Sequence, residues 1–538
     1  NVAGGKGGAI RASGIRTAVQ VNNSEFLKNS AGVGGAVSID SSAGLQMHTT
    51  AGLNNTATTG DGGFLFARSA SPILLSSVNI EGSTTSSDGG GGGLAVFGSK
   101  ILVVTTILKN CHAGKGGGGA ILLDEGASAT LLDSVLDDNS AMSSGGHIHV
   151  GASKLFVAGK GCEITWEITE PTFYDSAVLW YAFTENSMTR GSSSESGGAV
   201  SCIASLLGGK GVHLGKGTRL QDSFAASGGG AVSATLCAVD MVGTSIADST
   251  TQTGDGGAIL LSLDSTLRVD ATTAFKGNAA AVGSGGAISC QKCRSMEFKS
   301  GTEFQSNMAG SSGGAIHLSS PKSPVISSGT RFLANVAAED GGAIVSHDAN
   351  WTSLGDQFEF NVAEAGSGGA FASFATTVHL DATTSCNKNT ALKGGGGCLL
   401  WEPEAKNDKK WTKLKPFIGD MSLMTSNEAA YGAELATAGA SLRASVVASV
   451  DSATTLTRMT TDDKNILAPL YPKVEVLDWY GSVVRGKFAK DVEVKAILLD
   501  GGAELFGATV AKASKNGTSS FSGLGIQGRP GSGPHNIS

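Results

Sequence analysis

Acidic side chains recur at one position of this sequence, directly before a run of glycines. They are Asp61, Asp88, Asp255 and Asp340. Polysaccharide lyases and glycoside hydrolases use carboxylates that converge with Lys or Arg in one solvent groove for acid–base chemistry. Asp61 and Asp255 lie about seven or eight repeats apart, more than ~30 Å at the spacing of stacked strands. We therefore expect these residues to form backbone corners, with surface calcium binding and catalysis as the alternatives.

Two histidines, His147 and His149, lie two residues apart, so their side chains share one face of an extended strand. Asp137 and Asp138 lie one corner away. Neighbouring imidazoles are common zinc ligands. No third ligand is evident, so we expect both histidines to occupy positions in a ladder of stacked side chains. We predict no catalytic residue, no cofactor and no metal site.

The chain has eight cysteines, two of them in the sequence Cys290-Gln-Lys-Cys293, a spacing found in zinc and redox sites. There is no second such pair and no strand–helix–strand pattern around it. In an extended strand the two α-carbons would lie ~10 Å apart, too far for a disulfide, so they could pair only across a corner. Cys202 shares the register of Cys290 but lies about three turns away, also too far. We expect core thiols or disulfides between neighbouring turns.

The composition indicates a folded chain with an uncharged polar surface. The 538 residues include 79 Gly and only 10 Pro, 40% are hydrophobic and 16% are charged. A disordered chain would have fewer apolar and more charged residues. The net charge of −7 argues against nucleic-acid binding. The longest apolar run, residues 177–183, is too short for a membrane span. Because the chain starts at Asn1 without methionine, we expect a fragment or processed product.

A short motif recurs along most of the chain: two glycines, then Ala or a substitute, then an apolar residue. The residue after the glycine pair falls at Ala9, Ala36, Phe64, Leu94, Ala120, His147, Ala199, Ala231, Ala258, Ala287, Ala315, Ala343, Ala370 and Cys398. The steps span 26 to 32 residues, apart from one of 52. We interpret the long step as one repeat with a projecting insertion near residues 160–190, because the stretch from Trp166 to Tyr181 is rich in aromatic residues.

A second motif, a large apolar residue followed three positions later by Asn, precedes the first by a nearly constant distance. It starts at Phe26, Ile107, Leu136, Phe275, Phe304, Phe332, Phe358 and Cys386. The apolar residue should fill the core. The Asn tolerates a left-handed corner and can bond to the backbone or to the Asn of the next turn.

A constant period near 28 residues indicates stacked supersecondary units. Each unit contains short runs of β-forming residues separated by Gly, Ser and Asn, which predicts several short strands per turn. We therefore predict an all-β fold: a right-handed parallel β-helix of about 13–15 turns, ~65–75 Å long. The residues that we expect to define the repeat are Gly257, Ala258, Phe275, Asn278, Gly286, Ala287, Phe304, Asn307, Gly314, Ala315, Phe332, Asn335, Gly342, Ala343, Phe358 and Asn361.

The paired motifs resemble the repeats of the chlamydial polymorphic outer membrane proteins, and related arrays occur in large surface proteins of algae and other protists. The resemblance covers residues 1–440, with residues 427–433 as a degenerate last turn. It implies a pectin-lyase-like β-helix presented outside the cell, with adhesion as the usual role.

The C-terminal part departs from the bacterial family, which ends in a membrane-embedded barrel. We expect a linker or cap at residues 441–470. Residues 471–538 read as alternating strands and resemble the opening of an immunoglobulin-like β-sandwich, which with about 68 residues is shorter than the usual ~100. This combination favours a fragment of a large eukaryotic surface protein. The stretch from Trp401 to Trp411 breaks the glycine pattern, and we expect it to be a loop or linker that closes the end of the β-helix.

Taken as a whole, the sequence favours a non-enzymatic structural or adhesive protein, extracellular or at the cell surface (in the outer membrane if bacterial). Its partners would be other surface or matrix proteins and glycans, with no nucleic acid and no membrane span in this stretch. The alternative is a carbohydrate-active β-helix enzyme, either a polysaccharide lyase or a glycoside hydrolase. A groove with carboxylates and basic residues on adjacent turns would distinguish the enzyme from the adhesive rod.

Overall fold

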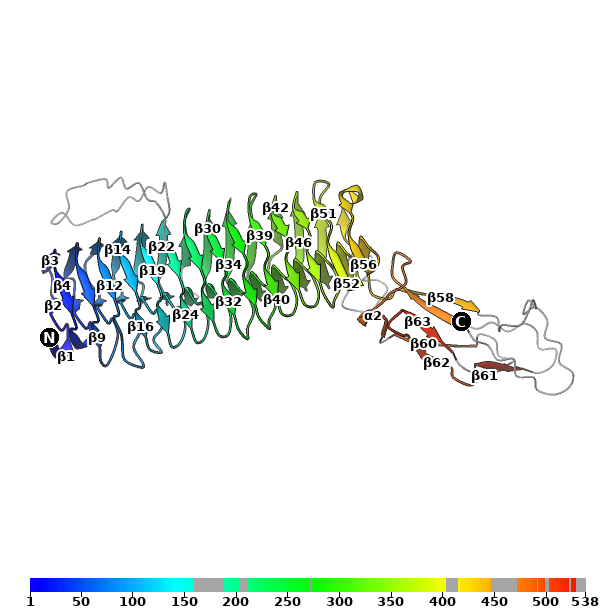
Figure 1. The fold of residues 1–538 in the computed structure, drawn as a ribbon, viewed down its shortest axis with the longest axis horizontal. Helices are drawn as coiled ribbons and strands as arrows, with labels where there is room; N and C mark the ends of the chain where they lie inside the picture. The colour runs from blue at the N-terminus through cyan, green and yellow to red at the C-terminus, as the bar shows by residue number, and fades with distance from the viewer. Residues whose placement is uncertain are drawn as a thin grey trace.

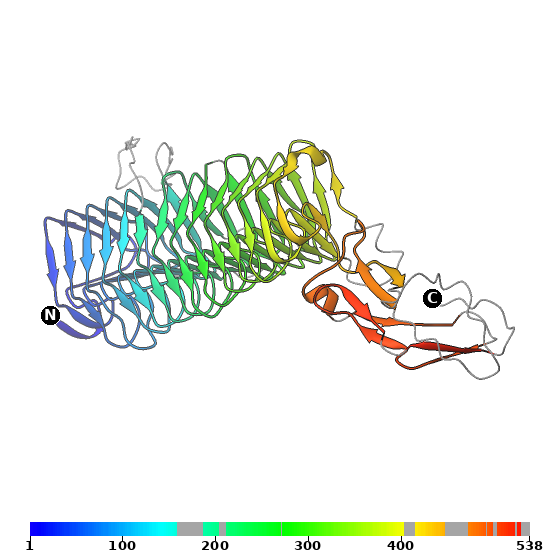
Figure 2. The same ribbon diagram turned by 45° about the vertical axis from the view of Figure 1, so that its right-hand side comes forward.

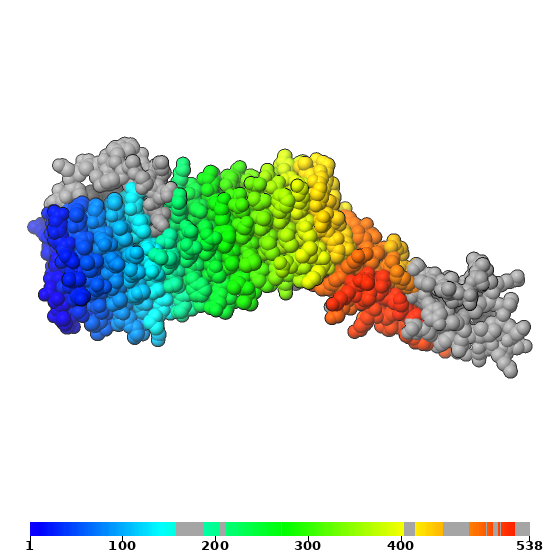
Figure 3. All heavy atoms as spheres, viewed as in Figure 1, coloured from blue at the N-terminus to red at the C-terminus, as the bar shows by residue number. Residues whose placement is uncertain are grey.

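A computed structural model describes residues 1–158, 187–203, 211–270, 272–402, 415–446, 472–490, 492–498, 503–521 and 524–528. The predicted all-β fold is confirmed: the repeats form a right-handed parallel β-helix, a rod in which each turn lies on the one before (Figure 1). Figure 2 shows the strands of each sheet one behind another along the rod. In the space-filling view, side chains close the visible surface between the turns (Figure 3).

One turn consists of four short strands, as the turn from β33 to β36 illustrates. Its strands are β33 (Ile259–Ser262), β34 (Thr266–Asp270), β35 (Ala274–Lys276) and β36 (Ala279–Ala280). Each strand pairs in parallel with its equivalent in the turns below and above, as β33 pairs with β29 (Val232–Thr235) and β37 (Ile288–Gln291). Stacking of equivalent strands therefore produces four long sheets.

The four sheets are numbered here by their order in one turn. Sheet 1 has 15 strands, from β2 (Ile10–Ser13) to β57 (Leu435–Ala436). Sheet 2 has 14, from β3 (Ala18–Asn22) to β54 (Phe417–Ile418), and sheet 3 has 14, from β4 (Glu25–Leu27) to β55 (Met424–Thr425). Sheet 4 has 11, from β16 (His112–Ala113) to β56 (Glu428–Tyr431). Strands β1 (Val2–Lys6), β5 (Ser30–Val33) and β9 (Thr56–Ala57) form a short sheet, which a bridge from Thr56 to Thr84 connects towards sheet 4.

The two glycines of the repeated motif have different structural roles. Gly256 has φ 70°, the left-handed region in which a side chain is strained. A Cβ on Gly257 would lie 2.1 Å from the Gly286 carbonyl oxygen of the next turn, so this position requires close backbone approach. The following Ala258 and Ile259 are fully buried in the core. The motif thus combines a corner, a tight contact between turns and a small core residue.

Aromatic residues of the second motif form a continuous stack inside the rod, as the sequence predicted. The rings of Phe275, Phe304, Phe332 and Phe358 follow one another with centroid distances of 4.8, 5.0 and 4.8 Å and interplanar angles of 3–5°. All four side chains are at most 2% exposed. The stack follows from the parallel pairing of the sheet 3 strands that carry the rings, which places equivalent residues directly above one another.

The asparagines of the same motif form a ladder of hydrogen bonds. The backbone N–H and Nδ2 of Asn278 donate to Oδ1 of Asn307 (3.1 and 3.0 Å), and Nδ2 of Asn307 also donates to the Phe275 carbonyl (3.0 Å). The pattern continues through Asn335, Asn361, Asn389 and Asn427. The predicted bond between asparagines of successive turns is confirmed. The left-handed residue, however, is the one before each Asn, for example Ser306 with φ 54°.

Two repeats are displaced by one residue from the register that the sequence indicated. Leu108, not Ile107, points into the core (0% against 43% exposed), and Cys111 takes the ladder position, with its N–H donating to Asn139. In the run of five glycines, Gly93 occupies the position assigned to Leu94, because Phe64 N–H donates to its carbonyl. Adjacent apolar residues and a glycine run leave the choice of face open in a short strand.

The 52-residue step corresponds to a single turn. Strand β21 (Ile148–Val150) pairs directly with β25 (Val200–Ile203). Strand β22 (Lys154–Ala158) belongs to sheet 2, and β23 (Ser187–Thr189) is the next strand in sheet 3. The predicted projection of residues 160–190 falls mostly on residues 159–186, outside the described part of the chain.

Beyond the β-helix, the described residues form antiparallel strands in three small sheets. Strand β59 (Pro472–Leu477) pairs with β58 (Ser441–Val446) and β63 (Thr518–Ser520). Strand β60 (Glu493–Lys495) pairs with β62 (Val510–Lys512), and β61 (Ala503–Phe506) pairs with β64 (Gly525–Gly528). The linker was expected to start at residue 441, but β58 already belongs to this antiparallel unit. The immunoglobulin-like assignment stays a prediction.

This C-terminal unit packs against the last turns of the β-helix. The Trp401 Nε1–H donates to the Tyr480 hydroxyl (3.0 Å), and the Lys487 ammonium, from helix α2 (Lys487–Lys490), pairs with Asp340. Apolar residues from both parts form one buried cluster, which includes Val345, Ala372, Leu400, Tyr431, Val476, Val484 and Ala489. None of the described helices is long and apolar enough to cross a membrane.

Candidate functional site

The acidic residues before the glycine pairs hold corners between turns. Asp61 Oδ1 accepts from the Gly90 N–H (2.8 Å), Asp255 Oδ1 from the Ser284 N–H (2.7 Å), and Asp340 Oδ1 from the Ser367 N–H (2.8 Å). Each bond joins a carboxylate to the backbone of the following turn, so the predicted corner role is confirmed at these three positions. Asp88 is exposed. Burial raises the pKa of Asp61, although the Gly90 N–H opposes the shift.

The two histidines do not share a face, contrary to the expectation from their spacing. His147 replaces the usual core alanine, is fully buried, and its Nδ1 lies 3.0 Å from Asn139 Nδ2. His149 follows the inward Ile148 on β21 and lies outside the core. The glycine corner that precedes the strand breaks the alternation between them. Burial lowers the pKa of His147 to about 4. Nowhere in the described ranges do three His, Cys, Asp or Glu side chains gather as a metal site would require.

Six of the cysteines form three disulfides inside the rod. Cys290 and Cys293 are joined across a corner, with α-carbons 5.5 Å apart, which confirms the only geometry in which they could pair. Cys202 is bonded to Cys237 of the next turn. Cys386 is bonded to Cys398, so that a disulfide replaces the apolar Phe and Ala of one repeat. The sequence did not identify these last two partners.

A groove crosses several turns on the outer side of sheet 4. The sheet 4 strands β16, β24 (Ser192–Ser193), β32 (Thr250–Thr251) and β40 (Met308–Ala309) run along the lower edge of Figure 1. Its volume is about 710 Å³. This hydroxyl groove is lined by Thr84, Thr85, Ser86, Ser87, His112, Ala113, Gly114, Ser140, Ala141, Met142, Ser192, Ser193, Ser194 and Phe224. None of these described lining residues is Asp, Glu, Lys or Arg.

The floor of the hydroxyl groove is a single row of residues in register. Thr84 bridges to His112, His112 pairs with Ser140, Ser140 with Ser192, and Ser192 with Phe224. His112 Nδ1 lies 2.6 Å from the Ser140 Oγ, which fixes the orientation of the imidazole. The Phe224 ring is 40% exposed. The row therefore presents polar side chains on four successive turns, followed by the Phe224 ring on the fifth.

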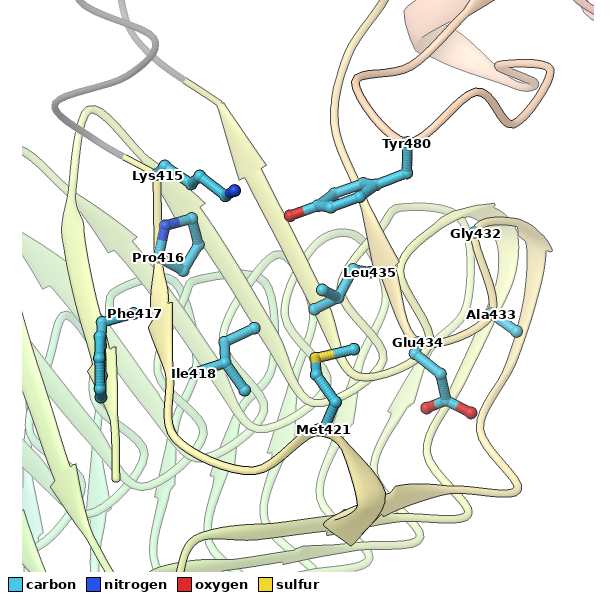
Figure 4. Close-up of a pocket in the computed structure, with 10 residues that line it drawn as sticks. All are labelled: Lys415, Pro416, Phe417, Ile418, Met421, Gly432, Ala433, Glu434, Leu435 and Tyr480. Carbon is cyan, nitrogen blue, oxygen red and sulfur yellow. The ribbon is translucent and has the colours of Figure 1, made fainter. Parts of the chain in front are cut away.

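A second cleft, also of about 710 Å³, lies at the C-terminal end of the β-helix. In Figure 4 the Lys415 ammonium and the Tyr480 hydroxyl point toward each other above Leu435, Ile418 and Met421. Burial raises the pKa of Tyr480, which also accepts from Trp401.

The one carboxylate that lines this end cleft, Glu434, is bonded to Nδ2 of Asn427, the last Asn of the ladder. The cleft is thus formed mainly by the exposed end of the core and by the contact with the C-terminal unit.

Comparison with family models, with curated proteins and with solved structures finds no match for this chain. Its function must therefore be inferred from its own residues. The hydroxyl groove was missed in the sequence, although a signal was present. In each repeat the floor residue immediately follows the ladder position, as Ser140 follows Asn139 and His112 follows Cys111. Alignment of the repeats on the ladder would have isolated this exposed row.

Proposed function

We propose that this chain is a non-enzymatic structural or adhesive rod, located outside the cell or at its surface. The observation that carries the proposal is that the recurring acidic side chains hydrogen-bond to the backbone. Asp61, Asp255 and Asp340 are the carboxylates that a polysaccharide-cleaving enzyme on this scaffold would be expected to employ, and each is bonded to the backbone of the next turn. Their role is to fix the spacing between turns.

The disulfides support an extracellular location. Three pairs occur within the β-helix, at Cys202–Cys237, Cys290–Cys293 and Cys386–Cys398. Disulfides form and persist in secreted and surface proteins and are rare in the reducing cytosol. Cys111 is a buried free thiol whose pKa burial raises to about 12, so it stays protonated and unreactive.

The architecture supports a mechanical role. Fifteen strands in sheet 1 span ~67 Å at the spacing of paired strands. Within the rod the aromatic stack runs unbroken from Phe275 to Phe358, and the asparagine ladder runs unbroken from Asn278 to Asn427. Such a rod holds surface groups at fixed intervals. The same proposal has three further parts: the repeats are of the polymorphic outer membrane protein type, the β-helix is pectin-lyase-like, and the C-terminal unit is immunoglobulin-like.

The test uses the purified full chain in two assays. Beads coated with it are scored for attachment to cells and to extracellular matrix, against beads coated with the heat-unfolded chain. In parallel, the chain is incubated with a panel of neutral and acidic polysaccharides, and new reducing ends or unsaturated products are measured. We expect attachment that depends on the folded rod and no product. Product formation that Asp255→Ala abolishes would refute the proposal in favour of a lyase or hydrolase.

A further inference from the structure

We propose that the hydroxyl groove binds a neutral glycan chain, laid lengthwise across the turns. This inference rests on the adhesive function proposed above and names the chemistry of its partner. It starts from the row Thr84, His112, Ser140, Ser192 and Phe224, which repeats once per turn.

The spacing of the row matches a polymer of sugars. Successive floor residues are separated by the distance between paired strands, ~4.8 Å. This distance is close to the length of one hexose unit in an extended polysaccharide. A chain lying along the rod therefore meets an equivalent protein position at each sugar, and five turns provide room for several consecutive units. A compact ligand would use only a fraction of such a groove.

The chemistry of the lining favours hydroxyl-rich ligands. Ser and Thr hydroxyls both donate and accept, as sugar hydroxyls do, so either partner can adapt to the other. Ser87 and Ser194 of the lining are exposed, so a ligand in the groove can reach them.

Two flat rings lie at the two ends of the serine pair. His112 precedes Ser140, and Phe224 follows Ser192, so the rings are three turns apart, ~14 Å. The 40% exposed Phe224 offers an apolar surface against which the C–H face of a sugar ring can pack. Met142, 58% exposed, adds a flexible apolar side chain to the wall of the groove. Rings that bracket a polar centre are suited to hold two sugars and orient those between them.

The absence of Asp, Glu, Lys and Arg from the described lining decides between neutral and charged glycans. An acidic polysaccharide such as polygalacturonate or heparin would be recognised through Arg or Lys. A carboxylate placed against this lining would lose hydration without gaining an ion pair. The groove therefore selects against charge, and binding should change little with salt concentration.

The experiment is affinity electrophoresis of the full chain in native gels. The gels contain hydroxyethyl cellulose, soluble starch or galactomannan as neutral polymers, and polygalacturonate or heparin as charged ones. Mobility against polymer concentration gives a dissociation constant. We expect retardation by at least one neutral polymer, unchanged when salt is raised. Phe224→Ala and His112→Ala should each weaken binding by roughly tenfold, as loss of a central contact residue does.

The matched control is Met308→Ala. Met308 occupies the equivalent outward position of sheet 4, is 54% exposed, and lies outside the groove. It should bind as the parent does, and all three variants should keep the parent melting temperature because the altered side chains are exposed. Retardation by the charged polymers alone, by none of the polymers, or equally for parent and Phe224→Ala overturns the proposal.

Reducing ends are measured in the same samples to separate this inference from the proposed function. Binding with cleavage would refute the non-enzymatic rod and leave the glycan groove standing. Attachment of coated beads without any glycan binding would refute the glycan groove and leave the adhesive rod standing.

Discussion

Truncation of one ring in the aromatic stack, Phe304→Ala, tests whether the internal stacking stabilises the rod locally. Phe304 is 0% exposed and lies between Phe275 and Phe332, with ring centroids 4.8 and 5.0 Å away. It also meets the edge of Phe298 at 5.5 Å. Removal of a buried phenyl ring costs ~3–5 kcal/mol. The three ring contacts place this site near the upper end of that range.

The loss should be confined to nearby turns. In a solenoid each turn contacts only its neighbours, so a local defect does not unfold distant repeats directly. Hydrogen exchange measured by mass spectrometry on peptides along the rod reports this distribution. We expect lower protection in peptides from residues 275–335 and parental protection before residue 150.

The matched control is Phe360→Ala, the same truncation at a ring that is 48% exposed. Phe360 has φ 57°, and Ala334 already occupies the equivalent corner one turn earlier with φ 53°, so alanine fits this backbone. Protection should change little. If Phe304→Ala left residues 275–335 as protected as Phe360→Ala does, the ring would contribute nothing to the core and the reasoning would be refuted.

Three further predictions concern buried titratable groups and the corners. Burial raises the pKa of Asp356 from 3.8 to about 6, so the stability that the protonated carboxyl provides at low pH is lost as pH rises through 6. In thermal melts, Asp356→Asn should therefore raise the free energy of unfolding by up to ~3 kcal/mol at pH 7.5 but change it little at pH 4. Burial lowers the pKa of His147 from 6.5 to about 4, so the stability of the parent falls as pH drops from 6.5 towards 4. The His147→Ala variant should therefore lose less of its free energy of unfolding than the parent does when pH is lowered from 7 to 5. Asp255→Ala should lower the free energy of unfolding by ~1 kcal/mol, because the Ser284 N–H loses its acceptor, and this variant, like the parent, should form no product from polysaccharides. A larger loss in thermal melts would show that the corner organises more than one bond.

Much of the fold could be predicted because the same glycine, apolar and asparagine positions recur in repeat after repeat. Gly314 must be glycine for close approach, and Phe304 and Asn307 precede it by a nearly constant number of residues, so the period and the inward residues emerge together. The prediction was wrong where a motif residue has a neighbour of the same kind. At Ile107 and Leu108 two apolar neighbours compete for one inward position, and a shift by one residue exchanges core and surface in a strand.

The disulfide partners and the groove could be predicted only in part. Cys290 and Cys293 are neighbours in sequence, so a corner was the one geometry available to them. The pairing of Cys202 with Cys237 depends on which residues of successive turns meet at a corner, and this register was not available from the spacing of one motif. The floor of the groove has no constant residue type, and its positions vary between Thr, His, Ser and Phe.

This variation is itself informative about where function lies in the rod. The close-approach position of Gly257 is glycine in turn after turn, because a side chain there would collide with the backbone of the next turn. The outward row of sheet 4 carries no such requirement, since its side chains do not contribute to the core. Its residue types are therefore free to be set by what the surface contacts. Along this row the hydroxyl-rich stretch ends at Thr250. The next four turns carry Ala279, Met308, Val336 and Val362, before Thr390 and Glu428 in the last turns. The scaffold stays constant while its surface chemistry changes, so the hydroxyl-rich turns can bind a partner and the later turns can support them. An adhesive rod requires this organisation.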